Sequence, residues 1–402
     1  MTNLIDLVVF GASGSLSEKM IAPAIDSLLK RKIKIRPIGY GRSLKPDWWR
    51  WEYVQNEYKE VDKLKVSKDT IFYLALPIKA DLIKTIIDGI KQIKIDKENW
   101  KIAIEKPFGS NLNEAKQIKK ELERLFSSQQ IFPVDHYLTK DLVKNIMSFR
   151  FANPIIEEIW QAKNIDEIKI TAWEEEGIGN RGGYYDQFGA IKDMIQNHLI
   201  QVMLLLTIDR PKCINSQCLS RAKLALIKKI KIEKVRIGQY RGYRQEEGVN
   251  KNSKTETKAI INLRIDDKKW SNVPITLQTG KKQEEKLTEA EVVFKNNPRC
   301  LFGDRCQLLS NNKIVINLHP DNDIKLYLNH GTKIEQNLPE PVPLKINKID
   351  IYRNEKTPYE EILENIIDGL KINFANFDEI LESWKVVEKI DLIKKNSRLE
   401  IG

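Results

Sequence analysis

The sequence predicts an α/β plus α+β protein, with an N-terminal Rossmann-type parallel sheet and a larger C-terminal domain on a mainly antiparallel sheet. Strand-like and helical segments alternate up to about residue 138, which is typical of a parallel sheet covered on both faces. From residue 166 onward, strand-like runs follow one another with few helical patterns between them. A chain of 402 residues is also too long for one ordinary core. We therefore expect two domains, at 1–134 and 135–402.

The first half begins with a buried strand at 4–10, a GASG turn and an amphipathic segment with apolar residues at helical spacing. Pro23 lies in the first turns of that segment and is expected to displace the helix start. A tryptophan-rich stretch at about 47–58 is expected to be helical. The remaining predicted strands lie at 33–43, 70–77, 100–109 and 130–138, with helices at 79–94 and 111–126.

The second half is expected to form one sheet with a helix at about 188–207 packed on it. Two further helices are expected in the C-terminal tail, and the polar, glycine-containing segment 245–256 is expected to be an exposed loop. The predicted strands lie at 166–173, 232–243, 257–265, 273–278, 289–295 and 313–318, and the tail helices at 359–372 and 376–390.

Composition limits the class of protein. A hydrophobic content of 41% describes a folded chain, and no apolar run approaches the roughly 20 residues of a membrane-spanning helix. The N-terminal residues carry no basic region, so a cytoplasmic protein is expected. The net charge of +11 leaves nucleic-acid binding open, but the lysines are interspersed with acids, and a basic balance also suits phosphorylated small molecules.

The four cysteines, at 213, 218, 300 and 306, are spaced more widely than the CxxC pairs of zinc sites, and no histidine pair accompanies them. We expect reduced, unligated thiols and no metal site.

A polar stripe runs through the mostly apolar segment at 194–208 and begins at the residue before it. Asp193, Asn197 and Gln201 recur at i, i+4 and i+8, with His198 beside them. Burying such groups unpaired costs several kcal/mol, so the stripe should face partners or a ligand. Two interpretations of His198 remain open, a hydrogen-bonded core histidine and a general base.

The glycine turn after the first strand is where a dinucleotide pyrophosphate docks on a helix N-terminus. The residues of this turn are Gly11, Ala12, Ser13, Gly14, Ser15 and Leu16. The second strand ends in Arg42 and Ser43, where an acidic residue would indicate NAD. Arginine instead matches a 2′-phosphate and favours NADP, unless it is a solvated surface residue.

Two further groups follow strands of the same sheet, at the edge where ligands bind. Lys106 comes directly after the run IAIE, and Asp135, His136 and Tyr137, with Lys140, follow the last strand of this half. Carboxylate, imidazole, phenol and ammonium within six residues suit a ligand site. A turn with structural hydrogen bonds is the alternative.

In these segments the chain resembles the glucose-6-phosphate dehydrogenase family along nearly its whole length. The family's glycine turn is similar to GASGSL, and its GYxRS to GYGRS. FYLALP (72–77), EKPFG (105–109) and RFAN (150–153) are intact. DHYLTK (135–140) resembles the family's DHYLGK, and RGGYYDQFGAIKDMIQNHLIQ (181–201) resembles its longest motif.

The resemblance implies oxidation of the C1 hydroxyl of β-D-glucose 6-phosphate to the lactone, the first step of the pentose phosphate pathway, with hydride passing to NADP. His198 would be the general base, and Asp135 would hold its tautomer. The residues implied to bind the 6-phosphate are His136, Tyr137 and Lys140. Glu174 and Asp193 would accept hydrogen bonds from sugar hydroxyls, and Lys281 would add a substrate contact.

The resemblance also implies cofactor contacts. Lys106 would bridge substrate and cofactor, and Ser13, Arg42 and Ser43 would hold the 2′-phosphate.

Several positions depart from the family pattern. Ser15 replaces an Asp, and Glu18 lies in a stretch that is strongly basic in the family, so NAD stays possible as a weaker or dual cofactor. Thr139 replaces a glycine, so the backbone there must tolerate a Cβ.

A homo-oligomer, dimer or tetramer, is expected, with no recognisable second NADP site. The alternatives are an NAD-preferring sugar-phosphate dehydrogenase, a non-catalytic relative and a nucleic-acid binder.

Overall fold

The computed structural model describes residues 4–270, 272–296, 300–331, 339–346 and 356–402. The chain forms two compact units, and each is assembled from three stretches of sequence. The first unit contains Met1–Thr139, Lys212–Arg221 and Asn354–Trp384, and the second contains Lys140–Pro211, Ala222–Arg353 and Lys385–Gly402.

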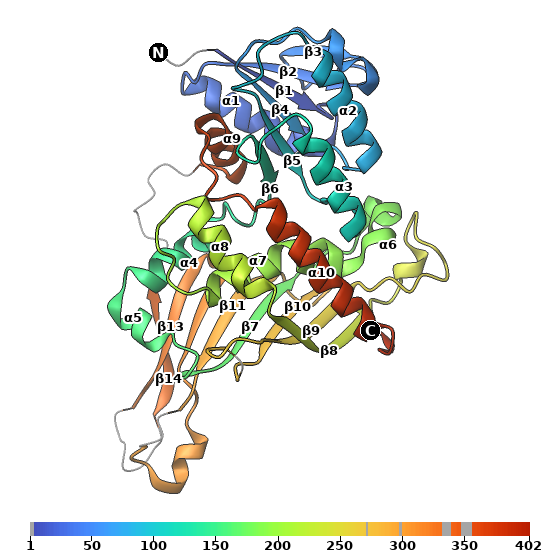
Figure 1. Ribbon diagram of the computed structural model, residues 1–402. Helices are drawn as coiled ribbons and strands as arrows, with labels where there is room; N and C mark the ends of the chain where they lie inside the picture. The colour runs from blue at the N-terminus through green and yellow to red at the C-terminus, as the bar shows by residue number, and fades with distance from the viewer. Residues whose placement is uncertain (1–3, 271, 297–299, 332–338, 347–355) are drawn as a thin grey trace. The chain divides into compact units, whose positions relative to one another are not determined.

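The first unit is built on a six-stranded, wholly parallel sheet, as the alternating pattern predicted (Figure 1). The strand order is β3-β2-β1-β4-β5-β6, so the direction of winding reverses between β1 and β4. The strands are β1 (Ile5–Phe10), β2 (Ile35–Gly41), β3 (Glu52–Gln55), β4 (Thr70–Leu74), β5 (Lys101–Glu105) and β6 (Ile131–Val134).

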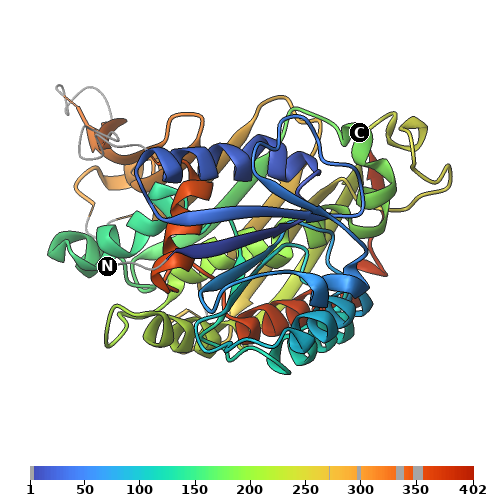
Figure 2. The same ribbon diagram turned by 90° about the horizontal axis from the view of Figure 1, so that it is seen from above.

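Helices cover both faces of this sheet because its strands carry apolar residues on both sides (Figure 2). Helices α2 (Ala80–Gln92) and α3 (Leu112–Glu123) pack together on one face, and α1 (Ala22–Lys30) lies on the other. Helix α3 begins at Asn111, whose side chain accepts from the Glu114 N–H at 3.0 Å.

The helix before α1 is widened into a π-helical turn at Ser17–Ile21. Pro23 has no N–H for an i→i−4 bond, and the widened turn lies immediately before it. The proline therefore alters the helix without delaying its start.

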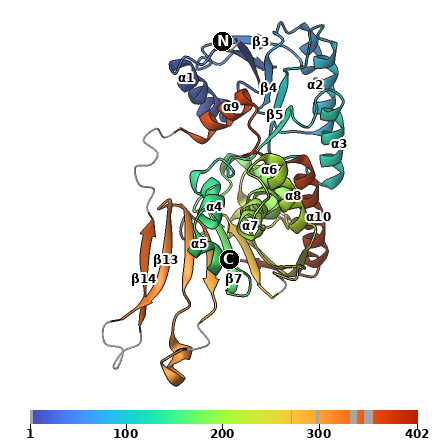
Figure 3. The same cartoon turned by 60° about the vertical axis from the view of Figure 1, so that its left-hand side comes forward.

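Helix α9 (Pro358–Asp368) comes from the far end of the chain, yet it packs beside α1 on the parallel sheet (Figure 3). Its buried face, including Tyr359, Ile362 and Ile366, shares one core with Val9 and Tyr73 of the strands. The first unit is therefore discontinuous in sequence.

The second unit is built on a nine-stranded, mainly antiparallel sheet, with β7 parallel to β10 and β8 parallel to β15. The order is β14-β13-β12-β11-β7-β10-β9-β8-β15. The strands are β7 (Ile165–Trp173), β8 (Ile230–Gln239), β9 (Lys258–Ile265), β10 (Ile275–Gly280), β11 (Leu287–Phe294), β12 (Lys313–His319), β13 (Asp323–His330), β14 (Glu340–Ile346) and β15 (Leu399–Ile401).

A helical segment packs on this sheet and contacts β7 and β10. It consists of α6 (Gly182–Ala190), a π-helix at Ile191–Leu199 and α7 (Ile200–Thr207), so the helix predicted at 188–207 is confirmed with an earlier start. The remaining helices are α4 (Asp141–Phe151), α5 (Pro154–Ile159), α8 (Ser216–Ile227) and α10 (Phe377–Lys394). The sequence did not predict α4, α5 and α8, nor β13, β14 and β15.

The helix predicted at 47–58 is wrong, because Glu52–Gln55 forms edge strand β3 beside β2. Trp49 is fully buried, and its indole N–H donates to the Glu52 carbonyl oxygen at 2.9 Å. The neighbouring tryptophan rings pack edge-on around it. The tryptophans thus hold a turn, after which Tyr53 and Val54 favour an extended chain.

The expectation of reduced cysteines is also wrong. Disulfides join Cys213 to Cys218 and Cys300 to Cys306, with Cα–Cα separations of 5.8 and 6.0 Å. Both separations fall inside the range of about 4.4–6.8 Å that a disulfide spans.

Among the helices of the described residues, none is long and apolar enough to span a bilayer.

Candidate active site

The turn after β1 is a tight glycine turn. Gly11 has φ 75°, and a Cβ there would lie 2.5 Å from the Ala75 carbonyl oxygen, so the position requires glycine. The Gly14 N–H and the Ser17 hydroxyl both donate to the Gly11 carbonyl oxygen, at 2.9 and 3.0 Å. Gly14 and Ser15 are exposed, so phosphate oxygens can approach their backbone closely.

The end of β2 supplies an exposed cation next to this turn. The Arg42 guanidinium lies over the Tyr58 ring, 5.5 Å from its centroid, and Ser43 is also exposed. The turn is held by Gln55 and Tyr53, whose side chains donate to the carbonyl oxygens of Arg42 and Ser43. A Cβ at Gly41 would lie 3.9 Å from the Ser13 hydroxyl, so Ser13 is close to the end of β2.

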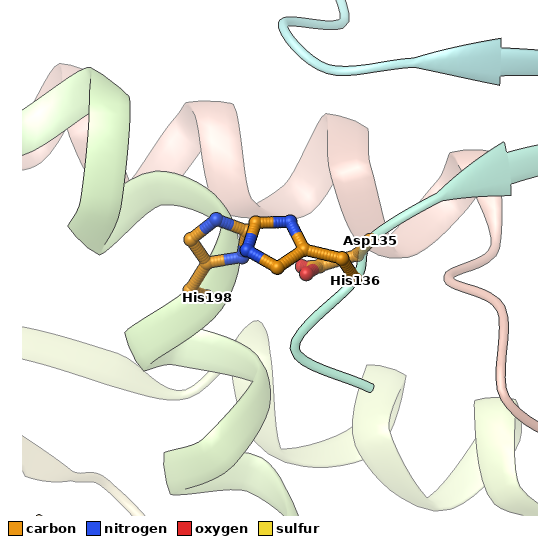
Figure 4. A group of neighbouring side chains, drawn as sticks. All are labelled: Asp135, His136 and His198. Carbon is orange, nitrogen blue, oxygen red and sulfur yellow. The ribbon is translucent and has the colours of Figure 1, made fainter. Parts of the chain in front are cut away.

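Lys106, Asp135 and His136 follow β5 and β6, at the same edge of the parallel sheet. Asp135 is 3% exposed, and its Oδ1 accepts from the Tyr137 N–H at 2.9 Å. Figure 4 shows Asp135 and His136 on the segment that leaves β6. The His136 ring packs edge-on against Tyr137, with centroids 5.2 Å apart.

Thr139 fits where the family has glycine. It is buried, it has no positive φ, and its hydroxyl donates to the His136 carbonyl oxygen at 3.0 Å. The Cβ is therefore accommodated, and the hydroxyl adds a bond that fixes the turn. Lys140 comes next, directly before α4.

In the second unit, His198 lies on the π-helix at Ile191–Leu199 (Figure 4). Its side chain is fully buried. A π-helix is hydrogen-bonded from residue i to residue i+5, and Asp193 and His198 are five residues apart on it. The predicted stripe is buried throughout, with Asp193 and Asn197 7% and Gln201 3% exposed. π-Helical turns occur frequently at functional sites.

Two predicted substrate contacts in this unit form an ion pair. Lys281 is 3% exposed, and its Nζ lies 2.6 Å from Glu174 Oε2. Its ammonium also lies over the Tyr185 ring, at 5.6 Å. Burial, helped by the nearby Asp193, Glu256 and Glu174 carboxylates, raises the pKa of Tyr185, so its hydroxyl stays protonated. Lys281 therefore balances part of a locally negative site.

The start of the π-helix is held by Glu256. Its Oε1 accepts from the Ile191 N–H at 3.2 Å, and its carboxylate is also paired with Lys394. Gly189 makes this approach possible, because it has φ 70° and a Cβ there would lie 2.5 Å from Glu256 Oε1.

Gly189→Ala is expected to lower the free energy of unfolding by about 1–3 kcal/mol, since it adds backbone strain and displaces Glu256. Gly179→Ala is the matched control. Gly179 also has positive φ, but a Cβ added there would meet no atom of the described residues within 4 Å. Urea unfolding of both variants checks this; equal losses would contradict the role of Glu256.

Sequence reasoning missed two groups beside the predicted ones. Lys223 is 2% exposed on α8 and donates to Gln201 Oε1 at 2.8 Å, but its helix was not predicted. Glu105 is buried at the end of β5 and accepts from the Tyr73 hydroxyl at 2.6 Å. A carboxylate inside the apolar run IAIE was the one available signal.

The chain matches two family models in order. The model described as "Glucose-6-phosphate dehydrogenase, NAD binding domain" matches residues 46–145, and "Glucose-6-phosphate dehydrogenase, C-terminal domain" matches 147–400. The glucose-6-phosphate 1-dehydrogenase of Dickeya dadantii (strain 3937) is 31% identical, over 96% of this chain and 90% of that protein.

Two solved structures are similar over the whole chain. A glucose-6-phosphate 1-dehydrogenase from Mycobacterium avium has a TM-score of 0.87 and 27% identity, covering 100% of this chain and 94% of that chain. A glucose-6-phosphate dehydrogenase in complex with its substrate glucose-6-phosphate has the same TM-score and coverage, with 28% identity.

Proposed function

Because the chain belongs to the glucose-6-phosphate dehydrogenase family, we propose that it is the NADP-linked enzyme of that family, with His198 as its general base. It oxidises D-glucose 6-phosphate at C1 to 6-phospho-D-glucono-1,5-lactone, the first step of the pentose phosphate pathway. The observation that carries this function is the match of both family domains, in order and across nearly the whole chain.

The proposed chemistry removes a proton and a hydride from one carbinol. His198 takes the C1 hydroxyl proton, and Asp135 holds the imidazole in the required tautomer and stabilises the imidazolium. NADP, when bound, accepts the hydride from C1. The burial of both His198 and Asp135 supports these roles, because a base excluded from water keeps its orientation.

The substrate is proposed to be held at both ends. His136, Tyr137 and Lys140 bind the 6-phosphate, since a phenol, an imidazole and an ammonium supply donors to a dianion. Glu174 and Asp193 accept hydrogen bonds from sugar hydroxyls, and Lys281, neutralised by Glu174, adds a donor to the substrate. We propose that 1–134 carries the cofactor site and 135–402 the substrate machinery.

The proposed cofactor site is the glycine turn and the end of β2. Backbone groups of Gly11, Ala12, Gly14, Ser15 and Leu16 would hold the phosphates, and Lys106 would contact both cofactor and substrate. Ser13, Arg42 and Ser43 bind the 2′-phosphate. NADP is supported by the exposed Arg42 guanidinium, and Glu18, also exposed, favours some use of NAD.

Arg42→Ala is expected to raise the KM for NADP about tenfold or more and the KM for NAD less than threefold, because only NADP carries the phosphate that the guanidinium binds. Initial rates with each cofactor check this. Arg50→Ala, which removes another exposed arginine of the same unit, is the control. Equal rises in the two KM values would contradict the assignment.

A homo-oligomer, dimer or tetramer, is also proposed. Strands β13 and β14 expose Leu328, Val342, Leu344 and Ile346, an apolar surface typical of protein contacts. Sedimentation analysis of the protein in solution tests the oligomeric state.

A cytoplasmic location is proposed because the substrate and cofactor are charged phosphates.

The direct test follows reduced nicotinamide in a spectrophotometer. Glucose 6-phosphate with NADP is expected to give the highest kcat/KM among hexose phosphates. A large advantage with NAD would favour the related NAD-linked enzyme. No turnover with any hexose phosphate would favour a non-catalytic relative, and salt-sensitive DNA retention without turnover would favour a nucleic-acid binder.

A further inference from the structure

Glu105 is a buried carboxyl one residue before Lys106, and none of the roles proposed above uses it. It is the last residue of β5 and is 5% exposed. The Tyr73 hydroxyl, on the adjacent strand β4, donates to its Oε1 at 2.6 Å. The Tyr359 hydroxyl, from the first turn of α9, is its second hydrogen-bond partner. Both phenols are almost completely buried.

Helix α9 is attached to β5 at both ends. At the other end, Lys101, the first residue of β5, donates from Nζ to the Ile366 and Ile367 carbonyl oxygens at 2.7 and 2.6 Å. The last backbone carbonyl oxygens of a helix have no N–H donor within the helix, and a cation such as the Lys101 ammonium supplies the missing donor. Helix α9 therefore runs antiparallel along β5, with Tyr359 at the carboxyl end of the strand and the last helical turn at its amino end.

We propose that Glu105, held between Tyr73 and Tyr359, is a positioning residue that fixes the carboxyl end of β5 and with it Lys106. Helix α9 then belongs to the framework of the active site, although it lies about 250 residues further along the chain. The inference rests on the proposed function, since it takes Lys106 as the residue that bridges substrate and cofactor.

The surroundings of Glu105 make its charge sensitive to pH near neutrality. The pKa of Glu105 is raised to about 7, chiefly by burial and to a smaller extent by the Asp135 carboxylate. The hydrogen bonds from Tyr73 and Tyr359 and the Lys106 ammonium act in the opposite direction and lower it. Burial also raises the pKa values of both tyrosines, so they remain donors. The ionised carboxylate attracts Lys106, and this attraction is expected to weaken as pH falls below about 7.

Tyr73→Phe and Tyr359→Phe each remove one donor to the carboxylate, which raises the pKa of Glu105. We expect the acid limb of the kcat/KM profile for glucose 6-phosphate to move upward by about 0.5–1 pH unit, with a loss of about 2–5-fold at pH 7. Lys101→Met is the matched control, because it releases the other end of α9 from β5. It is expected to lower Tm and leave the acid limb in place.

Glu105→Gln keeps the shape of the side chain and an acceptor for a tyrosine hydroxyl, but carries no charge at any pH. The kcat/KM of this variant is expected to lose the part of its pH dependence that comes from titration of Glu105. At pH 8 it is expected to stay about 3–10-fold below the wild-type value. A second readout is stability. The folded-state pKa lies above the ordinary value of 4.5, so the contribution of Glu105 is full below about 4.5 and is lost as pH rises through about 7. The Tm of Glu105→Gln relative to wild type is therefore expected to rise between pH 5 and pH 8.

These outcomes separate the inference from the function. An acid limb that stays in place in both tyrosine variants, or one that Lys101→Met moves equally, would overturn the positioning role of Glu105 while the function stands. A wild-type enzyme that does not reduce nicotinamide with glucose 6-phosphate would remove the function, and the inference with it. If a tyrosine variant fails to fold, Glu105→Gln decides the question.

Discussion

Replacing His198 with asparagine is expected to lower kcat by about 100-fold or more, while the KM for glucose 6-phosphate changes by less than about threefold. Transfer of a proton to a positioned side chain contributes about 10²–10⁴-fold to catalysis. Asparagine keeps a polar group at this fully buried position but cannot take the C1 hydroxyl proton. Steady-state rates with saturating cofactor check the expected split between kcat and KM.

His330→Asn is the matched control for this variant. His330 is exposed at the end of β13, so the same chemical change there is expected to leave kcat unchanged. A His198→Asn enzyme with wild-type kcat would remove His198 from its role. A large rise in KM with unchanged kcat would instead make it a binding residue.

Asp135→Asn is expected to lower kcat by about 10²–10³-fold, again with a small change in KM. The substitution removes the charge that stabilises an imidazolium and no longer selects the tautomer with the acceptor nitrogen toward the substrate. The local turn is expected to survive, because an asparagine Oδ1 can still accept from the Tyr137 N–H. Melting curves check the fold, and kinetics check the loss.

The outcome that contradicts this role is specific. If Asp135→Asn keeps full kcat at neutral pH with an unchanged Tm, the carboxylate neither orients nor stabilises the base. If kcat falls only because the protein unfolds, Asp135 is a structural residue of the turn.

The sequence predicted five of the six strands of the parallel sheet, all except β3, because each of the five is a short apolar run closed by a turn. The positions of the glycine turn and Arg42 after β1 and β2 are local features of the same kind, and their roles in binding the cofactor stay predictions. Helix α9 was predicted as a helix, but its periodicity does not say which sheet it packs on. Its place was fixed by distant contacts, among them Lys101 with Ile366.

Other features depend on pairings that no local pattern reveals. Lys281 meets Glu174 because β10 runs parallel to β7 with Gly280 opposite Trp173. Strand β14 was missed because EPVPLKI contains two prolines and is exposed along its whole length, so it shows no alternation. The stripe at 193–201 was predicted on α-helical spacing, and the π-helix changes which of its residues align.

A double-mutant cycle of His198→Asn and Asp135→Asn in kcat tests whether the two side chains act as one base. A carboxylate that acts only through the imidazole contributes nothing once the imidazole is gone. We predict that the double variant has a kcat within about threefold of His198→Asn alone. Losses that multiply, so that the double variant falls a further 100-fold or so, would contradict the proposal that the two side chains act as one base.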